Sequence, residues 1–534
     1  MKLNLLTCGL AGSRFLKFSF AVAVVVAGFR AQAAVINASN GSFTAVSAAV
    51  AQASAGDTVL IPAGTNSWPG ILTISGITLA GQGADKTVIL DESPMADNGS
   101  PLIQLNANNS QLTRVTGIQF SVGVTNKLPY QNYKGALLVS GPAPLWRIDH
   151  CQFTYMTAKP VHVGDASYGL IDHCSFLMKT TANAIEIFDT GYGDSSWAAP
   201  SVLGSSNAVY IEDNYIYSAN NFAAVDVSNG GRVVFRNNTM NGCFFNTHGT
   251  ETSQRFRSAR YVEIYNNSFT WGGGAQYNNF YTACDLRGGT AVVFSNSFVG
   301  FWGVASINYY RATDNDPQFV PFFGATGLRA WDSNSPALLT GTAAATTNAL
   351  IVPGAAWTAD QWAGCTVYNN RSGLSGIVAA NSATSMTFKP SRTPSLQISF
   401  QPNDAFTIHR VYPMMDQPGV GQCDLLTGDS PTPVWLHFTP DPMYFWGNSL
   451  AVVYQTPTAA PATAGSGYPN VQENRDFFNN TPRPNYTPFT YPHPLTLITN
   501  SVGVTNTVVP PPTNSVPVAT NNLVPPTGLI IQPL

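Results

Sequence analysis

The chain has few charged residues for its length. Asp, Glu, Lys and Arg make up 10% of its 534 residues, against about 25% in typical soluble domains. Gly, Asn, Thr and Ser are abundant instead, which favours stacked strands with polar turns over helices. The formal net charge of −3 shows no basic excess, so a nucleic-acid partner is not expected. A polyanion would have to be held by local Arg, Lys or a metal ion.

Long hydrophobic runs are also missing. No segment reaches the roughly 18 uninterrupted apolar residues of a membrane-spanning helix. The apolar run 18–29 follows three basic residues and precedes Ala31-Gln-Ala33, the small-x-small pattern of a cleavage site. We therefore expect a signal peptide at residues 1–33 and a secreted or cell-surface mature chain without a transmembrane segment. Removing four basic groups with the signal changes the charge from −3 to −7.

Cysteine pairs with metal-binding spacing are absent. Cys8 leaves with the signal peptide, and the six remaining cysteines are Cys151, Cys174, Cys243, Cys284, Cys365 and Cys423. An even number in an exported chain permits disulfides, but the spacing does not define their pairing.

One short pattern recurs along the chain: an apolar residue, two variable residues, Asn or Cys, one variable residue and another apolar residue. The Asn or Cys positions are Cys151, Cys174, Asn214, Asn238, Asn267, Asn296 and Asn448. Most are 23 to 29 residues apart, which predicts one coil of a parallel β-helix per repeat, with equivalent positions stacked about 4.8 Å apart. Asn suits a tight corner because it tolerates the left-handed conformation. Cys151 and Cys174 become neighbours in this ladder, and buried thiols are favoured over a bridge.

The stretches Gly56–Gly64 and Ile77–Gly83 resemble the first coil of the pectate-lyase-like superfamily. The resemblance covers roughly residues 40–310 and 410–455. It implies an all-β fold, a right-handed parallel β-helix, with no single activity, because the superfamily includes lyases, hydrolases, esterases, isomerases and adhesins. The chain has neither the Arg-x-Pro-x-x-Arg motif of the lyases nor the Gly-His-Gly motif of the hydrolases.

Breaks in the repeat divide the mature chain into four parts. We expect a parallel β-helix at residues 34–323, a small inserted β module at 324–408, final β-helix coils at 409–455 and an irregular Pro-rich segment at 456–534.

A second strand precedes each repeat strand and carries one outward polar residue per coil. These residues form a predicted column of His162, Glu186, Asp226, Asn246 and Asp285, which Asp416 joins if the register persists after the insertion. His248 and Arg287 follow two positions later on the same side. In the superfamily the corresponding strand face often lines the saccharide groove.

The predicted catalytic residues are Asp226, His248, Asp285 and Arg287. Two carboxylates two coils apart are close to the separation used by inverting glycosidases. In a lyase, His248 or an Arg would instead take the proton alpha to a uronate carboxylate. Clustered carboxylates would then hold Ca²⁺ as the cofactor.

The predicted substrate-binding residues are Glu186, Asn246, Glu251, Arg257, Arg260, Asp416 and Trp271. Glu251, Arg257 and Arg260 belong to a polar segment that leaves the strand after His248. Trp271 opens one of two aromatic-rich loops, 271–281 and 301–310, that are candidates for stacking on sugars.

A second acidic column contains Asp149, Asp172 and Glu212, followed by Arg236. The word Trp146-Arg-Ile-Asp-His150 resembles a pectate-lyase motif, but its near-copy at residues 171–173 favours a structural coil repeat.

Two functional hypotheses follow. The first is a secreted, monomeric carbohydrate-active enzyme that cleaves an extracellular, uronic-acid-containing polysaccharide as a lyase or an inverting hydrolase. The alternative is a non-catalytic glycan-binding or surface-adhesion β-helix protein, in which the outward acids are simply solvated.

Overall fold

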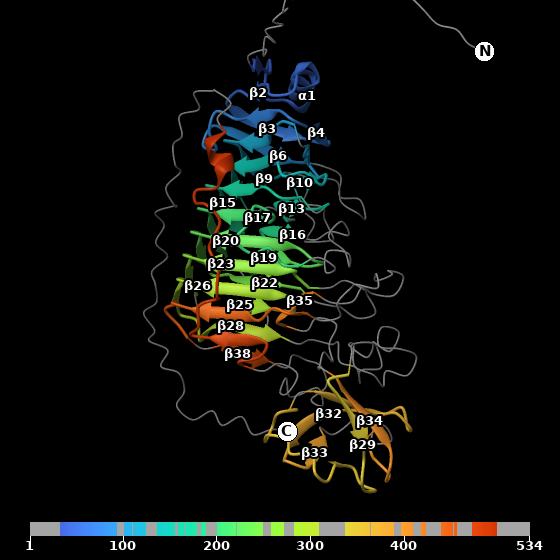
Figure 1. Ribbon diagram of the computed structural model, residues 1–534. Helices are drawn as coiled ribbons and strands as arrows, with labels where there is room; N and C mark the ends of the chain where they lie inside the picture. Colours follow the sequence, from blue (N-terminus) through green and yellow to red (C-terminus); the bar gives the residue numbers. More distant parts are fainter. Residues whose placement is uncertain are drawn as a thin grey trace, which may run out of the picture.

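The strands of the chain wind into a long parallel coil, seen in a computed structural model (Figure 1). The structure describes residues 33–92, 101–108, 110–123, 136–154, 159–165, 167–178, 183–187, 200–219, 222–248, 258–271, 282–308, 337–363, 365–388, 397–409, 418–422, 439–451, 453–456 and 473–498. The expected signal peptide lies outside these residues except for its last position. Within them, no helix is long and apolar enough to cross a membrane.

Three parallel sheets form the sides of the coil. Sheet A consists of β1 (Val35–Asn37), β2 (Thr58–Leu60), β5 (Thr78–Ala80), β8 (Thr113–Thr116), β11 (Trp146–Asp149), β14 (Leu170–Asp172), β17 (Val209–Glu212), β20 (Arg232–Arg236), β23 (Tyr261–Tyr265), β26 (Thr290–Phe294), β37 (Met443–Trp446) and β39 (Phe477–Asn479). Sheet B consists of β3 (Gly64–Trp68), β6 (Thr87–Asp91), β9 (Gln119–Val122), β12 (Gln152–Thr154), β15 (Ser175–Met178), β18 (Tyr215–Ser218), β21 (Thr239–Asn241), β24 (Ser268–Thr270) and β27 (Ser297–Val299). Sheet C consists of β4 (Leu72–Ile74), β7 (Ile103–Asn106), β10 (Leu137–Ser140), β13 (Val161–Val163), β16 (Ile185–Ile187), β19 (Ala223–Val227), β22 (Phe244–Thr247), β25 (Thr282–Leu286), β28 (Gly303–Asn308) and β38 (Val453–Thr456).

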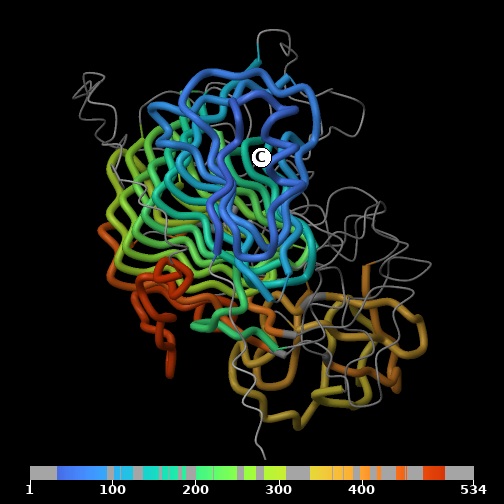
Figure 2. Tube along the Cα trace, turned by 90° about the horizontal axis from the view of Figure 1, so that it is seen from above, coloured from blue at the N-terminus to red at the C-terminus, as the bar shows by residue number. Residues whose placement is uncertain are grey.

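The chain passes from sheet C to sheet A to sheet B in each coil between β4 and β27. Figure 2 looks along the stack and shows the successive turns lying over one another. The predicted right-handed parallel β-helix is confirmed. Alternation of side chains along each strand sends one set of apolar residues inward, where they form a continuous core.

The corner between sheets A and B carries the repeating Asn. The residue before each Asn or Cys adopts a left-handed conformation, with φ between 51° and 58° from His150 to Ser295. Each Asn side chain then spans two coils: Asn214 Nδ2 donates to Asn238 Oδ1 at 3.0 Å, and Asn238 Nδ2 donates to Asn267 Oδ1 at 3.1 Å. The predicted corner ladder is therefore present.

A short helix, α1 (Phe43–Gln52), lies at the N-terminal end of the coil, where composition favoured strands. Ser42 caps it by accepting a hydrogen bond from the backbone N–H of Ala45 at 3.3 Å. Val46 and Ala49 are its buried residues. The local sequence favours a helix here, because the Ser42 cap is followed by an Ala-rich segment whose apolar residues lie on one side of the helix.

The described part of the predicted inserted module forms an antiparallel sheet with its own small core. Its strands, in spatial order, are β29 (Leu339–Thr342), β34 (Ala405–His409), β31 (Thr366–Asn369), β32 (Ser375–Asn381), β33 (Ser385–Phe388) and β30 (Leu350–Ile351). A separate two-stranded antiparallel sheet pairs β35 (Val420–Gln422) with β36 (Thr439–Pro440). The coil resumes at β37, which pairs with β26.

The Pro-rich segment after residue 455 contains more structure than its composition predicts. It contributes β39 to sheet A, and residues 480–498, named here the C-terminal strap, then cross the outer face of that sheet. The guanidinium of Arg236 donates to the carbonyl oxygens of Phe489 at 2.8 Å and Thr490 at 2.9 Å. A 3-10 helix at Pro494–Leu497 ends the strap, and Leu495 is buried against Leu112 and Leu170.

Candidate functional site

The outward column on sheet C lies in the order that the sequence predicts. Strand pairing places Glu186 beside Asp226, Asp226 beside Asn246, and Asn246 beside Asp285. The flanking Ile and Val side chains of β16 and β19 point into the core and are fully buried. Inward apolar packing therefore fixes which side chains face outward, because a one-residue slip would exchange the two sets.

Asp226 and His248 form the centre of the site. Nδ1 of His248 lies 2.8 Å from Oδ1 and 2.7 Å from Oδ2 of Asp226, and Asn246 Nδ2 donates to Oδ1 at 3.0 Å. The Asp226 side chain is 8% exposed, whereas that of His248 is 41% exposed. A buried carboxylate therefore supports an imidazole that faces outward.

The charge state of Asp226 is set by its surroundings. Burial raises the pKa of its carboxyl group, but the charges of His248, Lys159 and Arg287 and the His248 hydrogen bond outweigh this, so the net pKa lies below its ordinary value. The carboxylate is therefore ionised at neutral pH. An ionised Asp hydrogen-bonded to Nδ1 fixes the imidazole tautomer and leaves Nε2 as the proton acceptor.

A second carboxylate–imidazole pair occupies the neighbouring coils. Oε2 of Glu186 lies 2.9 Å from Nδ1 of His162, and Oε1 accepts a hydrogen bond from Lys159. Burial raises the pKa of Glu186, but His162 and Lys159 reverse the shift and leave it below the ordinary value. Two adjacent carboxylates on this face are thus held ionised by neighbouring basic groups.

Asp285 and Arg287 complete the described column. Asp285 is 2% exposed and lies two coils from Asp226, a backbone separation of about 10 Å. The backbone N–H of Arg287 donates to the Thr247 hydroxyl at 2.6 Å, and the charge of Arg287 reaches Asp226. The four predicted catalytic residues therefore share one face.

Asp416 does not follow Asp285 in the column. The register places Ser306 of β28 beside Asp285, and Tyr454 of β38 beside Ser306. The strand Gly303–Asn308 falls in a segment predicted to be an aromatic loop, because the Phe, Trp and Tyr residues on both sides obscure the strand pattern of its Val and Ile. Asp416, Glu251 and Arg257 themselves lie outside the described residues.

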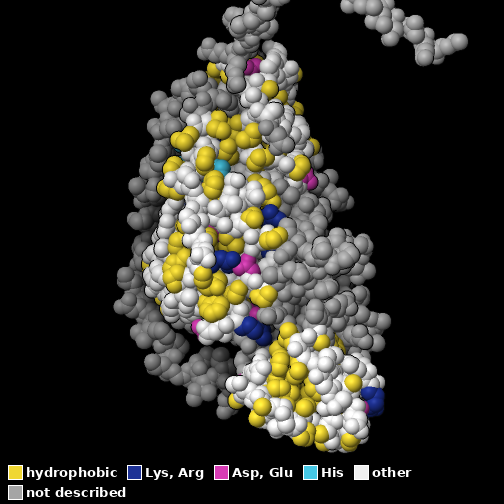
Figure 3. Space-filling model, viewed as in Figure 1, with side chains coloured by type: hydrophobic (Ala, Val, Ile, Leu, Met, Phe, Trp, Pro, Cys, Tyr) yellow, Lys and Arg dark blue, Asp and Glu magenta, His cyan; other side chains and the backbone are white. Residues whose placement is uncertain are grey.

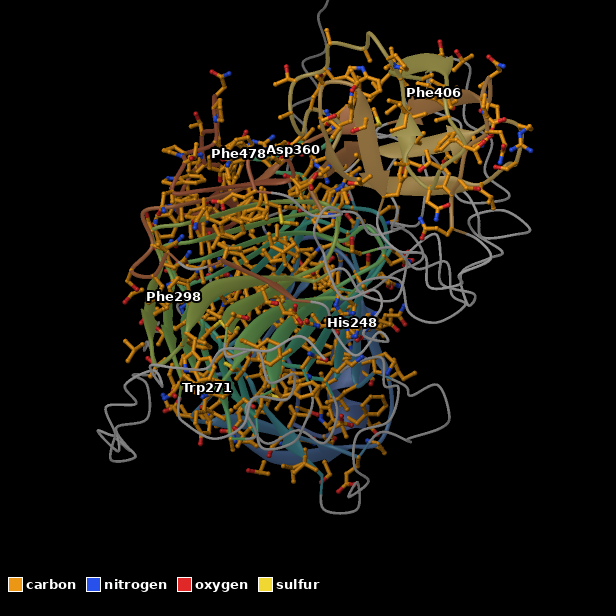
Figure 4. The ribbon with its side chains drawn as sticks, turned by 90° about the horizontal axis from the view of Figure 1, so that it is seen from below. His248, Trp271, Phe298, Asp360, Phe406 and Phe478 are labelled. Carbon is orange, nitrogen blue, oxygen red and sulfur yellow. The ribbon has the colours of Figure 1, made fainter. Side chains whose placement is uncertain are left out.

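Arg260 and Trp271 do not lie where their predicted substrate-binding role requires. Arg260 is fully buried next to β23 of sheet A and donates to the carbonyl oxygen of Gly421, so it anchors the chain that returns from the insertion. Trp271 follows β24 and packs against the coil, with its ring 5.5 Å from that of Phe301. Figure 4 shows Trp271 near Phe298 and well separated from His248.

Lys159 was missed as a site residue. His162, which the sequence places in the outward column but not among the predicted catalytic or substrate-binding residues, pairs with Glu186 in the strand register and contacts its carboxylate. Counting alternate residues back from Val161 predicts that the Lys159 side chain points inward. However, β13 begins only at Val161, so strand alternation does not determine the direction of side chains before that residue. Nothing local in the sequence signals this turn.

The second acidic column, on sheet A, is paired with arginine. Arg114 contacts Asp149 at 2.6 Å, Arg147 contacts Asp172 at 2.7 Å, and Arg236 contacts Glu212 at 2.6 Å. All three carboxylates are fully buried. The structural interpretation of this column is confirmed by these contacts.

The predicted Ca²⁺ does not fit the carboxylates of Glu186 and Asp226. Both oxygens of Glu186 bond to basic side chains, and both oxygens of Asp226 face His248. In the part of the chain that the structure describes, no group of three or more His, Cys, Asp or Glu is arranged to hold a metal ion. We therefore derive no catalytic step through calcium.

Comparison with known proteins adds structural neighbours but no family. No family model and no curated protein matches the chain. Similar solved structures include an alginate lyase from Paenibacillus, at 15% identity and a TM-score of 0.31 over 52% of this chain and 87% of that one. A PL6 family polysaccharide lyase from Pseudopedobacter saltans matches at 14% identity and a TM-score of 0.35, over 52% of this chain and 66% of that one. A Family 28 exopolygalacturonase from Yersinia enterocolitica matches at 11% identity and a TM-score of 0.21, over 52% of this chain and 72% of that one. At these values the similarity shows the fold alone.

Proposed function

We propose that the outer face of sheet C is the active site of a secreted enzyme that cleaves a uronic-acid-containing polysaccharide by β-elimination. The observation that carries the proposal is the pair of Asp226 and His248: a buried, ionised carboxylate supports a half-exposed imidazole. Such a pair supplies a general base that is held in place by its carboxylate partner.

The proposed reaction uses three groups of this face. Nε2 of His248 takes the proton from the carbon next to the uronate carboxylate, and Asp226 stabilises the resulting imidazolium. Arg287 supplies positive charge for the substrate carboxylate, whose neutralisation makes that carbon more acidic. The electron pair of the broken C–H bond forms a double bond as the glycosidic C–O bond breaks, and the leaving oxygen takes up a proton.

Inverting hydrolysis is less well supported by the same geometry. It requires one protonated carboxyl group as general acid. The pKa values of Asp226 and Glu186 are both lowered by basic neighbours, which removes these two candidates at neutral pH. Asp285 would have to act as acid without Asp226 as its free partner, because both Asp226 oxygens face His248.

The test is a panel of uronic-acid polysaccharides incubated with the mature chain. Lyase action produces an unsaturated uronate that absorbs in the ultraviolet, while hydrolysis produces only new reducing ends. We expect the ultraviolet product, its loss in His248→Gln and Asp226→Asn, and no loss on adding a chelator. Binding without either product would support the non-catalytic glycan-binding alternative, and reducing ends without ultraviolet absorbance would support the hydrolase.

A further inference from the structure

The corner between sheets A and B uses two kinds of side chain. From Asn214 to Asn448, each Asn amide donates to the next Asn oxygen at 2.9 to 3.1 Å. The two preceding corner positions are Cys151 and Cys174, which cannot continue an amide ladder. Each thiol instead donates to a backbone carbonyl within its own coil, at 3.3 Å in both cases.

The two cysteines occupy equivalent positions on adjacent coils. Strand pairing aligns Asp149 with Asp172, two residues before each cysteine. The backbone N–H of Cys174 donates to Asn214 Oδ1 at 2.9 Å, so the same corner continues across the change of residue. Adjacent coils are about 4.8 Å apart, which lies inside the 4.4–6.8 Å range of Cα separations in disulfides.

We propose that Cys151 and Cys174 are an oxidisable pair that closes into a disulfide, and so staples two coils, when the chain folds in the presence of a small-molecule disulfide such as oxidised glutathione. The thiolate of one cysteine attacks a glutathione sulfur, and one glutathione thiolate leaves. The second cysteine then displaces the other glutathione. Two protein thiols and one glutathione disulfide thus become one protein disulfide and two glutathione thiols.

The reaction belongs to folding rather than to the folded coil. Both thiols are free in the structure and buried at 2% exposure. Burial also raises the pKa of the Cys174 thiol well above its ordinary value, and the thiolate is the form that reacts. The pair is therefore expected to react while the corner is still open. Once formed, the bond supplies the link between coils that the amide ladder supplies further along.

The experiment refolds the full chain from denaturant in two arms, one with a mixture of oxidised and reduced glutathione and one with reduced glutathione only. Each product is digested without reduction and analysed by mass spectrometry. We expect a Cys151–Cys174 linked peptide, lighter by two hydrogens than its separate parts, in the oxidised arm only. Glutathione added to the already folded, reduced chain is expected to give less than a tenth of that link.

Controls and the contrary result are defined by the other cysteines. Cys174→Ser and Cys151→Ser should each abolish the link, and either variant alone suffices if the other fails to fold. Cys243 and Cys284, which are also buried, should remain alkylatable after denaturation in both arms. Refolded coil in which Cys151 and Cys174 are both alkylated after the oxidised arm would overturn the proposal. The linked form should also melt several degrees Celsius higher than the reduced form, and an unchanged melting temperature would overturn the stapling role.

Discussion

The outer faces of sheets A and C both carry a line of largely buried carboxylates, and the basic groups around them overlap only in part. On sheet A each of Asp149, Asp172 and Glu212 is paired with an arginine (Arg114, Arg147 and Arg236), and His150 and His173 also contact Asp149 and Asp172. On sheet C the partners of Glu186 and Asp226 include His162 and His248. A guanidinium stays protonated at neutral pH, whereas an imidazole exchanges its proton there.

The two faces also differ in how far other parts of the chain cover them. The strap lies over sheet A, where Arg236 and Glu212 are fully buried and bonded to strap backbone. On sheet C, His248 stays 41% exposed. Figure 3 shows one side of the molecule, on which charged side chains are few. The comparison teaches that similar acidic columns serve as internal bonding on one sheet and as a candidate reaction surface on the other.

The largest expected effect separates two histidines with the same kind of partner. His248→Gln should lower turnover about 10²–10⁴-fold, because it removes the general base. His173→Gln is the matched control: its Nδ1 lies 2.7 Å from Asp172 and its side chain is 37% exposed. Initial rates on the best polysaccharide of the panel measure both. Equal losses of turnover in His248→Gln and His173→Gln would show that the outer face of sheet C is no more important for catalysis than that of sheet A.

The next effect concerns stability on sheet A. Arg236→Met should lower the free energy of unfolding by about 3–5 kcal/mol, because it leaves the fully buried Glu212 without its cation. The double variant Arg236→Met/Glu212→Leu should recover most of the loss. Urea unfolding provides the measurement. Lys159→Met on sheet C, beside the partly accessible Glu186, should lower the free energy of unfolding by less. An equal loss would mean that the acidic columns of both sheets serve mainly to stabilise the fold.

A third effect depends on pH. Burial, with the charges of Arg236 and Arg147, lowers the pKa of His493 to about 4, against an ordinary value of about 6.5. The folded state resists protonation, so the contribution of neutral His493 is present above pH 6.5 and is lost as pH falls towards 4. The expected loss is on the order of 3 kcal/mol.

His493→Asn isolates this contribution from the other buried acids. Asn keeps an oxygen acceptor for the backbone N–H of Leu495, which now donates to Nδ1 of His493 at 3.2 Å. The difference in unfolding free energy between the wild type and this variant should change between pH 6.5 and 4. A constant difference would show that strap docking does not depend on the charge of His493.

The smallest effect is expected at the solvent side of the strap. Tyr491 is 53% exposed, and its hydroxyl donates to Asp213 at 2.9 Å. Tyr491→Phe should therefore cost at most about 1 kcal/mol, measured by the same urea titration. A cost as large as that of Arg236→Met would place the main attachment of the strap at its edge rather than over the buried ion pairs.

The coil could be predicted from sequence because its information is local and repeated. The Asn or Cys corner recurs with a nearly constant spacing, and alternation around Asp226 identified the outward column. Lys159 could not be assigned, because it enters the site from a turn that has no repeat. The strap could not be predicted either, because Arg236 binds backbone carbonyls of Phe489 and Thr490, and every residue type carries a carbonyl.

The strap also changes how the coil is expected to come apart. A solenoid whose coils touch only their neighbours can fray from its ends, one unit at a time. Here Arg147 reaches the carbonyl of Leu495, 348 residues later in the sequence, and Arg236 and Glu212 are tied to the same segment. Early coils are therefore expected to complete their contacts only after residues 489–496 have been synthesised. We expect slow folding, set by closure of this very long loop, and cooperative unfolding of all the coils beneath the strap.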